Sequence, residues 1–278
     1  MTLNAAEAGT IDVGGDLTVN RLGFGAMRIT GAGIWGDPPD REVAKSVLRR
    51  AVELGVNFID TADSYGPNVS EELIAEALYP YADDLVIATK GGLTRTGPGV
   101  WPSDGTPEHL VKALDGSLKR LKLEQIPLYQ FHRPDPNVPI EESLGVLVEA
   151  KNAGKIRHIG VSNFDETQIA IAQGLTPVVS VQNRYNVEDR SSETVVDLAE
   201  QEQFVFLPWA PISGDIAAVK DAAVNHGVSP RQVVLAWLLA RSPQILPIPG
   251  TGSIEHLEEN IAAASLRLSP AEVAAITG

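Results

Sequence analysis

Short apolar runs alternate along the chain with longer segments in which apolar residues recur at helical spacing. The short runs are bounded by turn residues and are apolar at almost every position, as in residues 85–88. This is typical of parallel strands that are buried on both faces. The pattern predicts eight strands, at residues 22–26, 57–60, 85–90, 126–132, 156–161, 178–182, 204–209 and 245–248.

Each intervening segment carries one apolar stripe and a charged opposite face, as expected for helices that cover a sheet. The first stripe consists of Val43, Val47, Leu48, Ala51 and Leu54, and the third consists of Leu110, Ala113, Leu114, Ser117, Leu118 and Leu121. Residues that favour a helix start precede several segments: Ser70, Thr106 with Pro107, and Ser229 with Pro230.

Eight strand–helix units follow one another without a linker or a shift in composition. This predicts one α/β domain over residues 1–278, a single (β/α)8 TIM barrel, because a doubly wound sheet of this length usually leaves a second, smaller lobe. Before the first strand, Gly14 and Gly15 separate β-favouring residues. Residues 10–20 therefore predict a short N-terminal hairpin that plugs the barrel floor.

The composition of the 278 residues excludes several classes of protein. With no cysteine there is no disulfide, no Cys-ligated metal and no cysteine nucleophile. The net charge of −14, from 36 acidic and 22 basic residues, disfavours binding to nucleic acid or to anionic membranes. The N-terminus is polar and no apolar run reaches the ~18 residues of a membrane span, so we expect a cytoplasmic protein.

Two short motifs carry little weight in this context. Residues 31–36 match the dinucleotide pattern G-x-G-x-x-G, but they lead into Asp37-Pro38-Pro39-Asp40 instead of a helix. We interpret them as a mobile loop on the barrel rim, in which Trp35 lines the pocket. Residues 68–70 match a glycosylation acceptor, a pattern that often arises by chance, and we disregard it.

Polar side chains with complementary chemistry fall at the ends of three consecutive predicted strands. Asp60 ends the second strand and Tyr65 follows it, Lys90 ends the third, and His132 ends the fourth. Neighbouring strands lie about 4.8 Å apart, so these four side chains can meet at the carboxyl end of a barrel. Taken singly, each of them has an ordinary structural role. Their common position favours a catalytic cluster.

Such a cluster suits the proton half of carbonyl reduction. We expect the Lys90 ammonium to lower the pKa of the Tyr65 phenol, and Asp60 to keep that ammonium charged. His132 would then donate a hydrogen bond to a carbonyl oxygen held beside Tyr65. The remaining histidines have no metal-ligand spacing, and we predict no metal site.

At these residues the sequence resembles the aldo-keto reductase superfamily. Residues 55–66 (GVNFIDTADSYG) are similar to its first signature, and residues 154–164 (GKIRHIGVSNF) to its middle one. Lys90 and the run 129–132 correspond to the catalytic positions between them. The similarity extends from about Arg21 to about Ala263.

The resemblance implies a barrel that binds NADP(H), with NAD(H) not excluded, across its carboxyl-terminal mouth. Tyr65 would be the general acid, Lys90 and Asp60 would tune it, and His132 would orient the substrate. The positions that would hold the cofactor are Ser162, Asn163, Gln182, Trp209, Ala210, Pro211, Gly250, Thr251, Gly252, Ser253, His256, Glu259 and Asn260. A glycine-rich turn that leads into a helix presents backbone N–H groups to phosphate, which agrees with the segment at 250–253.

Two departures from the family pattern bear on cofactor and substrate. Many relatives have Lys at the position of Gly250 and Arg at that of His256, whereas this chain has no Lys or Arg between Ile245 and Ala263. The loop at 210–214 is short and leads to a helix that we expect to begin near Asp215. A short loop predicts an open substrate pocket, with apolar walls from Trp35, Trp101, Phe131 and Trp209.

We therefore predict an NAD(P)H-dependent oxidoreductase that reduces an aldehyde or ketone, as a monomer or small homo-oligomer. Two alternatives stay open. One is a barrel that binds NADPH for sensing, resembling ion-channel auxiliary subunits. The other is a hydrolase that uses Asp60, Asp63 and Asp135 as paired carboxylates, which leaves Tyr65 and Lys90 without a role.

Overall fold

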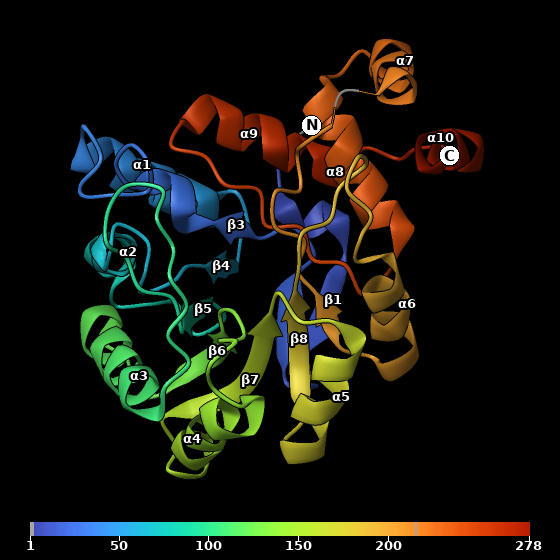
Figure 1. Ribbon diagram of the computed structural model, residues 1–278. Coiled ribbons are helices and arrows are strands. Elements are labelled where there is room, and N and C mark those ends of the chain that lie inside the picture. Colours follow the sequence, from blue (N-terminus) through green and yellow to red (C-terminus); the bar gives the residue numbers. More distant parts are fainter. Residues whose placement is uncertain (1–2, 215) are drawn as a thin grey trace.

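The computed structural model describes residues 3–214 and 216–278. Within this part, seven parallel strands form one curled sheet in chain order, and helices surround it (Figure 1). The strands are β3 (Phe24–Gly25), β4 (Phe58–Asp60), β5 (Val86–Gly91), β6 (Ile126–Phe131), β7 (Ile156–Ser162), β8 (Val178–Gln182) and β9 (Val205–Phe206). The predicted TIM barrel is confirmed.

The described helices include one after almost every strand. They are α1 (Arg41–Glu53), α2 (Val69–Leu78), α3 (Pro107–Leu121), α4 (Ile140–Asn152), α5 (Glu166–Leu175), α6 (Glu193–Glu202), α7 (Ala217–His226), α8 (Pro230–Arg241), α9 (Ile254–Ala262) and α10 (Pro270–Thr277). Short 3-10 turns occur at Ala5–Ala8, Ala26–Ile29 and Ala263–Ser265. None of the helices in the described ranges is long and apolar enough to cross a membrane.

The eighth strand, predicted at residues 245–248, is not a regular strand. The last segment instead closes the barrel through separate hydrogen bonds: Leu246 N donates to Phe206 O (2.9 Å), and Gly23 N donates to Pro247 O (2.9 Å). Pro247 and Pro249 lack an N–H, so this segment cannot make a continuous ladder with both neighbours. It still joins β9 to the β3 edge, and the ring of strands is closed.

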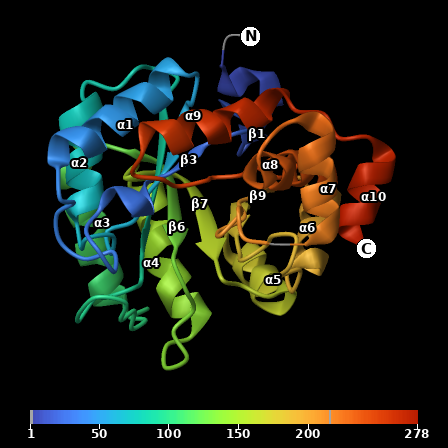
Figure 2. The ribbon, with the colours of Figure 1, turned by 90° about the horizontal axis from the view of Figure 1, so that it is seen from above.

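The predicted hairpin is confirmed as β1 (Thr10–Val13) paired antiparallel with β2 (Leu17–Asn20). Both turn glycines have positive φ, +67° at Gly14 and +82° at Gly15, which a side chain would disfavour. Apolar residues of the hairpin pack with inward-facing residues of the strands in one buried cluster. Figure 2 shows this blue N-terminal segment at one end of the barrel and the green loops after β5 and β6 at the other.

Some local predictions about the helices need correction. Thr106 and Ser229 cap α3 and α8 as expected. Ser70 does not cap α2, whose N-cap is Asn68; its hydroxyl is buried and donates to Ala26 O (3.1 Å). Val43 is 48% exposed and lies off the apolar stripe of α1. The predicted helix start near Asp215 lies outside the described residues, and α7 begins at Ala217.

Candidate active site

The four side chains predicted to meet do so at the carboxyl ends of β4, β5 and β6. Lys90 Nζ donates to Asp60 Oδ2 (2.7 Å), to Thr61 O (2.8 Å) and to Tyr65 OH (3.3 Å). The His132 ring lies edge-on to the Tyr65 ring, with 5.9 Å between centroids. Strand pairing explains the arrangement, because parallel register places Asp60 opposite Ala88, two residues before Lys90.

Two glutamines fix the carboxylate that faces Lys90. Gln130 Nε2 and Gln182 Nε2 donate to Asp60 Oδ1 at 3.0 and 2.9 Å. Both amides are buried, so each bond is made without competition from water. One Asp60 oxygen therefore serves the glutamines and the other serves Lys90. Sequence reasoning missed Gln130 and expected of Gln182 only a role in cofactor binding.

Burial governs the protonation of the cluster. It opposes the charge of Lys90, but Asp60 and Tyr65 outweigh it and raise the pKa of the ammonium above its usual value. Burial raises the pKa of Tyr65 above 10. Lys90 acts in the opposite direction but does not prevail, so the expected net lowering of the Tyr65 pKa is wrong for the protein alone. The phenol keeps its proton at neutral pH.

His132 is a neutral imidazole in this environment. Burial lowers its pKa well below 6.5, and the nearby charges of Lys90 and Arg133 act in the same direction. Ser64 Oγ lies 3.5 Å from His132 Nδ1. A neutral imidazole has one N–H, so the ring can donate a single hydrogen bond and accept another.

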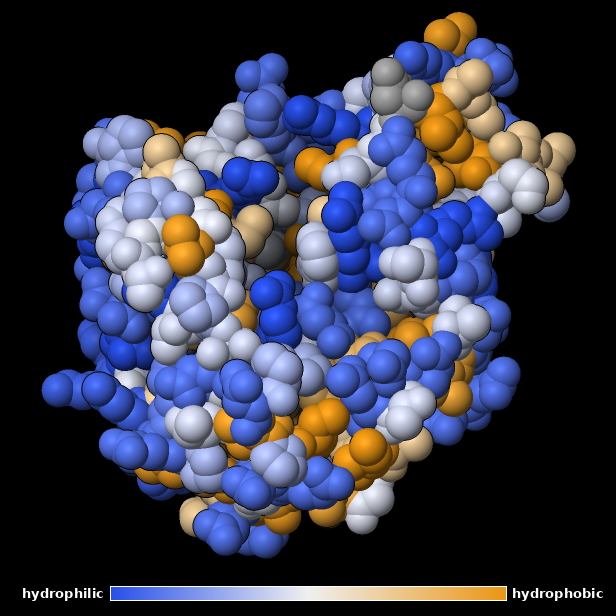
Figure 3. Space-filling view, viewed as in Figure 1, coloured by the Kyte–Doolittle hydropathy of each residue, from blue (hydrophilic) through white to orange (hydrophobic). Residues whose placement is uncertain are grey.

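A cavity of about 520 Å³ opens above these residues and is lined by Tyr65, His132 and Asp60. Figure 3 shows a hollow on the face that Figure 1 presents, with many hydrophilic residues on its rim. The apolar part of its wall includes Met27, Ile34, Leu93, Trp101, Trp209 and Ile212. A polar floor beneath apolar walls is the usual form of a small-molecule site.

Arg95 holds one side of this cavity in place, and sequence reasoning missed it. Its guanidinium lies 3.6 Å from the centroid of the Trp101 ring and donates to Ile34 O (2.6 Å) and Ser64 O (2.9 Å). It also donates to carbonyls of Gly33, Gly97 and Val100. The fork of donors therefore joins the loop at 31–36, expected to be mobile, to the loop that carries Trp101.

Two of the predicted wall residues do not line the cavity. Phe131 is fully buried and packs on Phe164, with 5.9 Å between ring centroids. It belongs to the core cluster that also contains residues of α3 and α4, so its expected place in the substrate pocket is wrong. Trp35 is 36% exposed and lies 5.6 Å from the Arg95 guanidinium, outside the lining.

Residues at and after the ends of β7, β8 and β9 form the far wall of the cavity. Asn163 has a positive φ of 60°, and its Nδ2 donates to His132 O (3.0 Å). Trp209 Nε1 donates to Asn163 Oδ1 (3.1 Å), and Ser162 Oγ donates to Gln182 O (2.8 Å). These bonds bring together the residues predicted to hold a nicotinamide. Ala210 and Pro211 complete this wall.

A smaller cavity of about 250 Å³ adjoins the first at the start of α9. Its lining includes the predicted positions Gly250, Thr251, Gly252, His256 and Asn260. Ser253 caps α9, and Glu259 Oε2 lies 3.7 Å from Arg231 Nη1; neither residue is part of the lining.

Comparison with known proteins agrees with this site. The model of the aldo/keto reductase family matches residues 21–218 and 215–278. The chain belongs to the aldo/keto reductase family. The match covers both signature segments and all four catalytic candidates, so the resemblance seen in the sequence is confirmed.

Three relatives place the chain among oxidoreductases. An uncharacterized oxidoreductase of Schizosaccharomyces pombe is 48% identical, over 96% of this chain and 88% of its own. Pyridoxine 4-dehydrogenase of Escherichia coli is 42% identical, over 95% of this chain and 96% of its own. An aldo/keto reductase of Klebsiella pneumoniae, solved in complex with NADP and acetate, is 26% identical over 96% of this chain and 93% of its own, with a TM-score of 0.82.

The two adjoining cavities suit the dinucleotide that aldo/keto reductases use. Asn260 Oδ1 is buried at the smaller cavity and has no hydrogen-bond partner among the described residues, so it is left as an acceptor for a donor from a ligand. At the opening between the cavities, the backbones of Gly25 and Gly250 approach closely: a Cβ at Gly250 would lie 2.5 Å from Gly25 O. Glycine at these two positions allows the two backbones to pack this closely beside the cavities.

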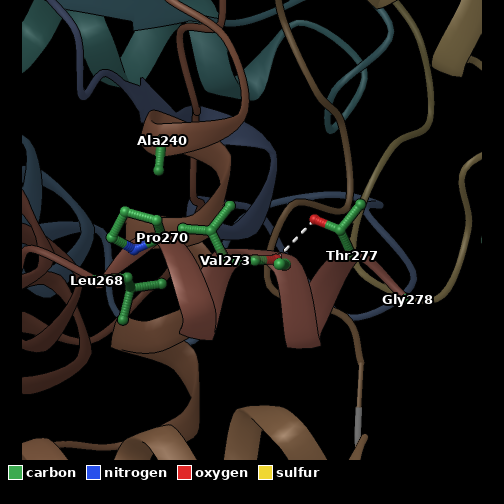
Figure 4. Close-up of a pocket in the computed structure, with 7 residues that line it drawn as sticks. Ala240, Leu268, Pro270, Val273, Thr277 and Gly278 are labelled. Carbon is green, nitrogen blue, oxygen red and sulfur yellow. Dashed lines mark hydrogen bonds between the residues drawn. The ribbon is translucent and has the colours of Figure 1, made fainter.

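A third cavity, of about 690 Å³, lies far from the barrel mouth and is not the active site. It is formed between α8 and α10, with Ala240, Leu268, Pro270 and Val273 on its walls (Figure 4). The Thr277 hydroxyl there donates to Val273 O within α10 (2.7 Å). Its lining carries no titratable side chain that could perform acid–base chemistry.

Proposed function

We propose that this aldo/keto reductase is an NAD(P)H-dependent carbonyl reductase in which Tyr65 is the general acid. The observation that carries the proposal is the hydrogen-bonded series from Asp60 through Lys90 to Tyr65 at the floor of the 520 Å³ cavity. The series directs a buried cation at the Tyr65 hydroxyl, and Tyr65 lines the cavity.

The chemistry of the residues follows from this geometry. When bound, the reduced dinucleotide supplies the hydride. As negative charge develops on the carbonyl oxygen, the Tyr65 phenol donates its proton to that oxygen. Lys90, 3.3 Å from the phenolic oxygen, stabilises the phenolate that results. Asp60 and its two glutamines keep Lys90 charged and in place through the step.

His132 orients the substrate. Its ring lies beside that of Tyr65, and a neutral imidazole donates one hydrogen bond to the carbonyl oxygen without competing as an acid. Trp101 also lies edge-on to Tyr65, with 6.2 Å between centroids, and lines the same cavity. A carbonyl held at Tyr65 would therefore have both a donor and an apolar ring nearby.

A flat aromatic aldehyde suits the walls best. Trp101 and Trp209 are rings in the lining, and the lining also contains the Arg133 cation. The 42% identical relative is named for pyridoxine, a ring-bearing alcohol, so pyridoxal, the corresponding aldehyde, is the first substrate to test. Small aliphatic aldehydes leave most of this wall uncovered and should be reduced less efficiently.

The paired-carboxylate hydrolase is not supported. Both Asp60 oxygens are engaged by Lys90 and the glutamines. Asp135 accepts from Gly105 N (3.0 Å) and Asn137 N (2.9 Å), which hold its loop and lower its pKa. Burial raises the pKa of Asp63 well above its usual value, which disfavours the ionised form that a paired-carboxylate mechanism needs.

The test has two steps. Titration with NADPH and with NADH, followed by the fluorescence of Trp101 and Trp209, should show saturable binding of at least one of them. The protein with its reduced cofactor is then mixed with a panel of carbonyls that begins with pyridoxal. Oxidation of the cofactor should be seen as a loss of its absorbance. If neither NADPH nor NADH binds, the proposal is contradicted. If a dinucleotide binds but no carbonyl is reduced, a sensing barrel is favoured.

A further inference from the structure

The two cavities at the barrel mouth form one continuous cleft. Arg28, Ile212 and Gly250 line both of them, so the cleft runs from Tyr65 past these residues to the start of α9. An extended dinucleotide with its reactive ring beside Tyr65 would cross the shared residues with its middle. Its other half would then occupy the smaller cavity.

Two arginines from distant parts of the sequence line the smaller cavity of this cleft. Arg28, from the turn Ala26–Ile29, lies at the junction, and its Cγ is 3.7 Å from the point where a Cβ at Gly250 would lie. Arg231, in the first turn of α8, lines the smaller cavity only. The segment 245–263 has no Lys or Arg, so these two side chains supply the guanidinium charge in the lining of the smaller cavity.

Neither guanidinium is saturated by protein partners in the cleft. Arg28 is exposed. Arg231 is 47% exposed in its side chain and forms an ion pair with Glu259, in which the 3.7 Å from Nη1 to Oε2 is longer than a hydrogen bond. In a chain with a net charge of −14, exposed cations inside a cleft are the groups able to attract an anion against the overall field.

The surroundings of Arg231 also point to adenosine. At the same cavity, Asn260 Oδ1 is a buried acceptor that no described residue satisfies, and an amino group on a ring would satisfy it. A ligand with a ring amino group and a nearby phosphate ester matches both features. The arginine fork binds such a phosphate through two parallel hydrogen bonds.

We propose that Arg231 binds the 2′-phosphate of NADP(H) and Arg28 the pyrophosphate, so that Arg231 determines the preference for NADP(H) over NAD(H). The proposal rests on the proposed function, since it assumes that the cleft takes a dinucleotide. It gives the two arginines different tasks: one contacts a group present in both cofactors, and the other contacts a group that only NADP(H) carries.

Dissociation constants for NADPH and NADH test this assignment, measured by tryptophan fluorescence without a carbonyl present. The variants are Arg231→Met and Arg28→Met, which keep an unbranched apolar stem and remove the charge. Arg49→Met is the control, because Arg49 lies on α1 outside both cavities. Arg231→Met should raise the dissociation constant for NADPH about tenfold and that for NADH less than twofold. Arg28→Met should raise both dissociation constants by a similar factor.

Each outcome has a distinct meaning. The inference is overturned if the ratio of the dissociation constants for NADPH and NADH is the same in Arg231→Met as in the wild type. It is also overturned if the wild type binds NADH more tightly than NADPH. Adenosine 2′,5′-bisphosphate gives independent support if it competes with NADPH in the wild type and its affinity falls about tenfold in Arg231→Met. If the wild type binds neither dinucleotide, the proposed function itself fails.

Discussion

Lys90 Nζ and Asp60 Oδ2 lie 2.7 Å apart, and both side chains are almost completely buried. An ammonium in such surroundings is stable only with a close counter-charge, so the pair is a condition for the charge that faces Tyr65. The same pair links the β4 and β5 strand ends. In the proposed mechanism, catalysis and folding thus depend on one contact.

Asp60→Asn should therefore harm both properties. Breaking a buried pair by removal of one partner destabilises a protein by about 3–5 kcal/mol. Reduction should fall by roughly 100-fold or more, since Lys90 loses its charge or its position. Urea unfolding and steady-state rates measure the two effects. Asp83→Asn, at an exposed position, is the control and should change neither; an Asp60→Asn protein of wild-type stability would contradict the account.

The pH dependence of reduction follows from two pKa directions. Tyr65 acts in its protonated form and its pKa is raised above 10, so proton donation persists through neutral pH and declines only at strongly alkaline pH. His132 acts in its neutral form and its pKa is lowered well below 6.5, so the rate should not fall as the pH drops to 6.5. A rate profile of kcat would show a broad plateau. A sharp inflection between pH 7 and 8 that is lost on His132→Gln would contradict it.

Arg95→Lys tests whether the Arg95 guanidinium holds the Trp101 side of the cavity in place. Lysine lacks the planar fork that contacts several carbonyls and stacks on Trp101, so that ring should lose its fixed position beside Tyr65. We expect KM for an aromatic aldehyde to rise roughly five- to tenfold, with NADPH affinity within twofold of the wild type. Arg49→Lys is the matched control. An unchanged KM would show that Arg95 does not position the substrate wall.

Phe131 and Trp101 give a paired test of which aromatic residue belongs to the pocket. Phe131→Ala removes a ring from the core and should cost about 3–5 kcal/mol of stability, with the ratio of KM values for aromatic and aliphatic aldehydes unchanged. Trp101→Ala should change that ratio and cost less stability, because Trp101 is only partly buried. Thermal unfolding and a two-aldehyde assay distinguish them. If Phe131→Ala changes the KM ratio and Trp101→Ala does not, Phe131 belongs to the substrate pocket after all.

The catalytic cluster could be predicted from the sequence because it follows from chain order. In a parallel barrel every strand delivers its last residues to the same end, so Asp60, Lys90 and His132 meet once their runs are recognised as consecutive strands. The side-chain period of two also bears on Phe131. Leu128 lies in the interior cluster and Tyr129 in the outer one, which places Phe131 outside and Gln130 inside.

What could not be predicted depends on contacts between segments far apart in the chain. Arg28 and Arg231 are about two hundred residues apart and meet at one cavity only after the barrel closes. Arg95 gains its role from carbonyls of three separate loops. The irregular end of the sheet has a local cause, Pro247 and Pro249, but whether the ring still closes there depends on hydrogen bonds to both neighbouring strands.

The proton-donor role of Tyr65 is the central claim, and Tyr65→Phe tests it most directly. The substitution removes one hydroxyl and keeps the ring that packs against His132 and Trp101. Dissociation constants for NADPH and the rate of aldehyde reduction should be measured on the same preparation. The account predicts NADPH binding within about twofold of the wild type and a reduction rate lower by a factor of roughly 100 to 10,000. Unchanged reduction with intact cofactor binding would contradict it.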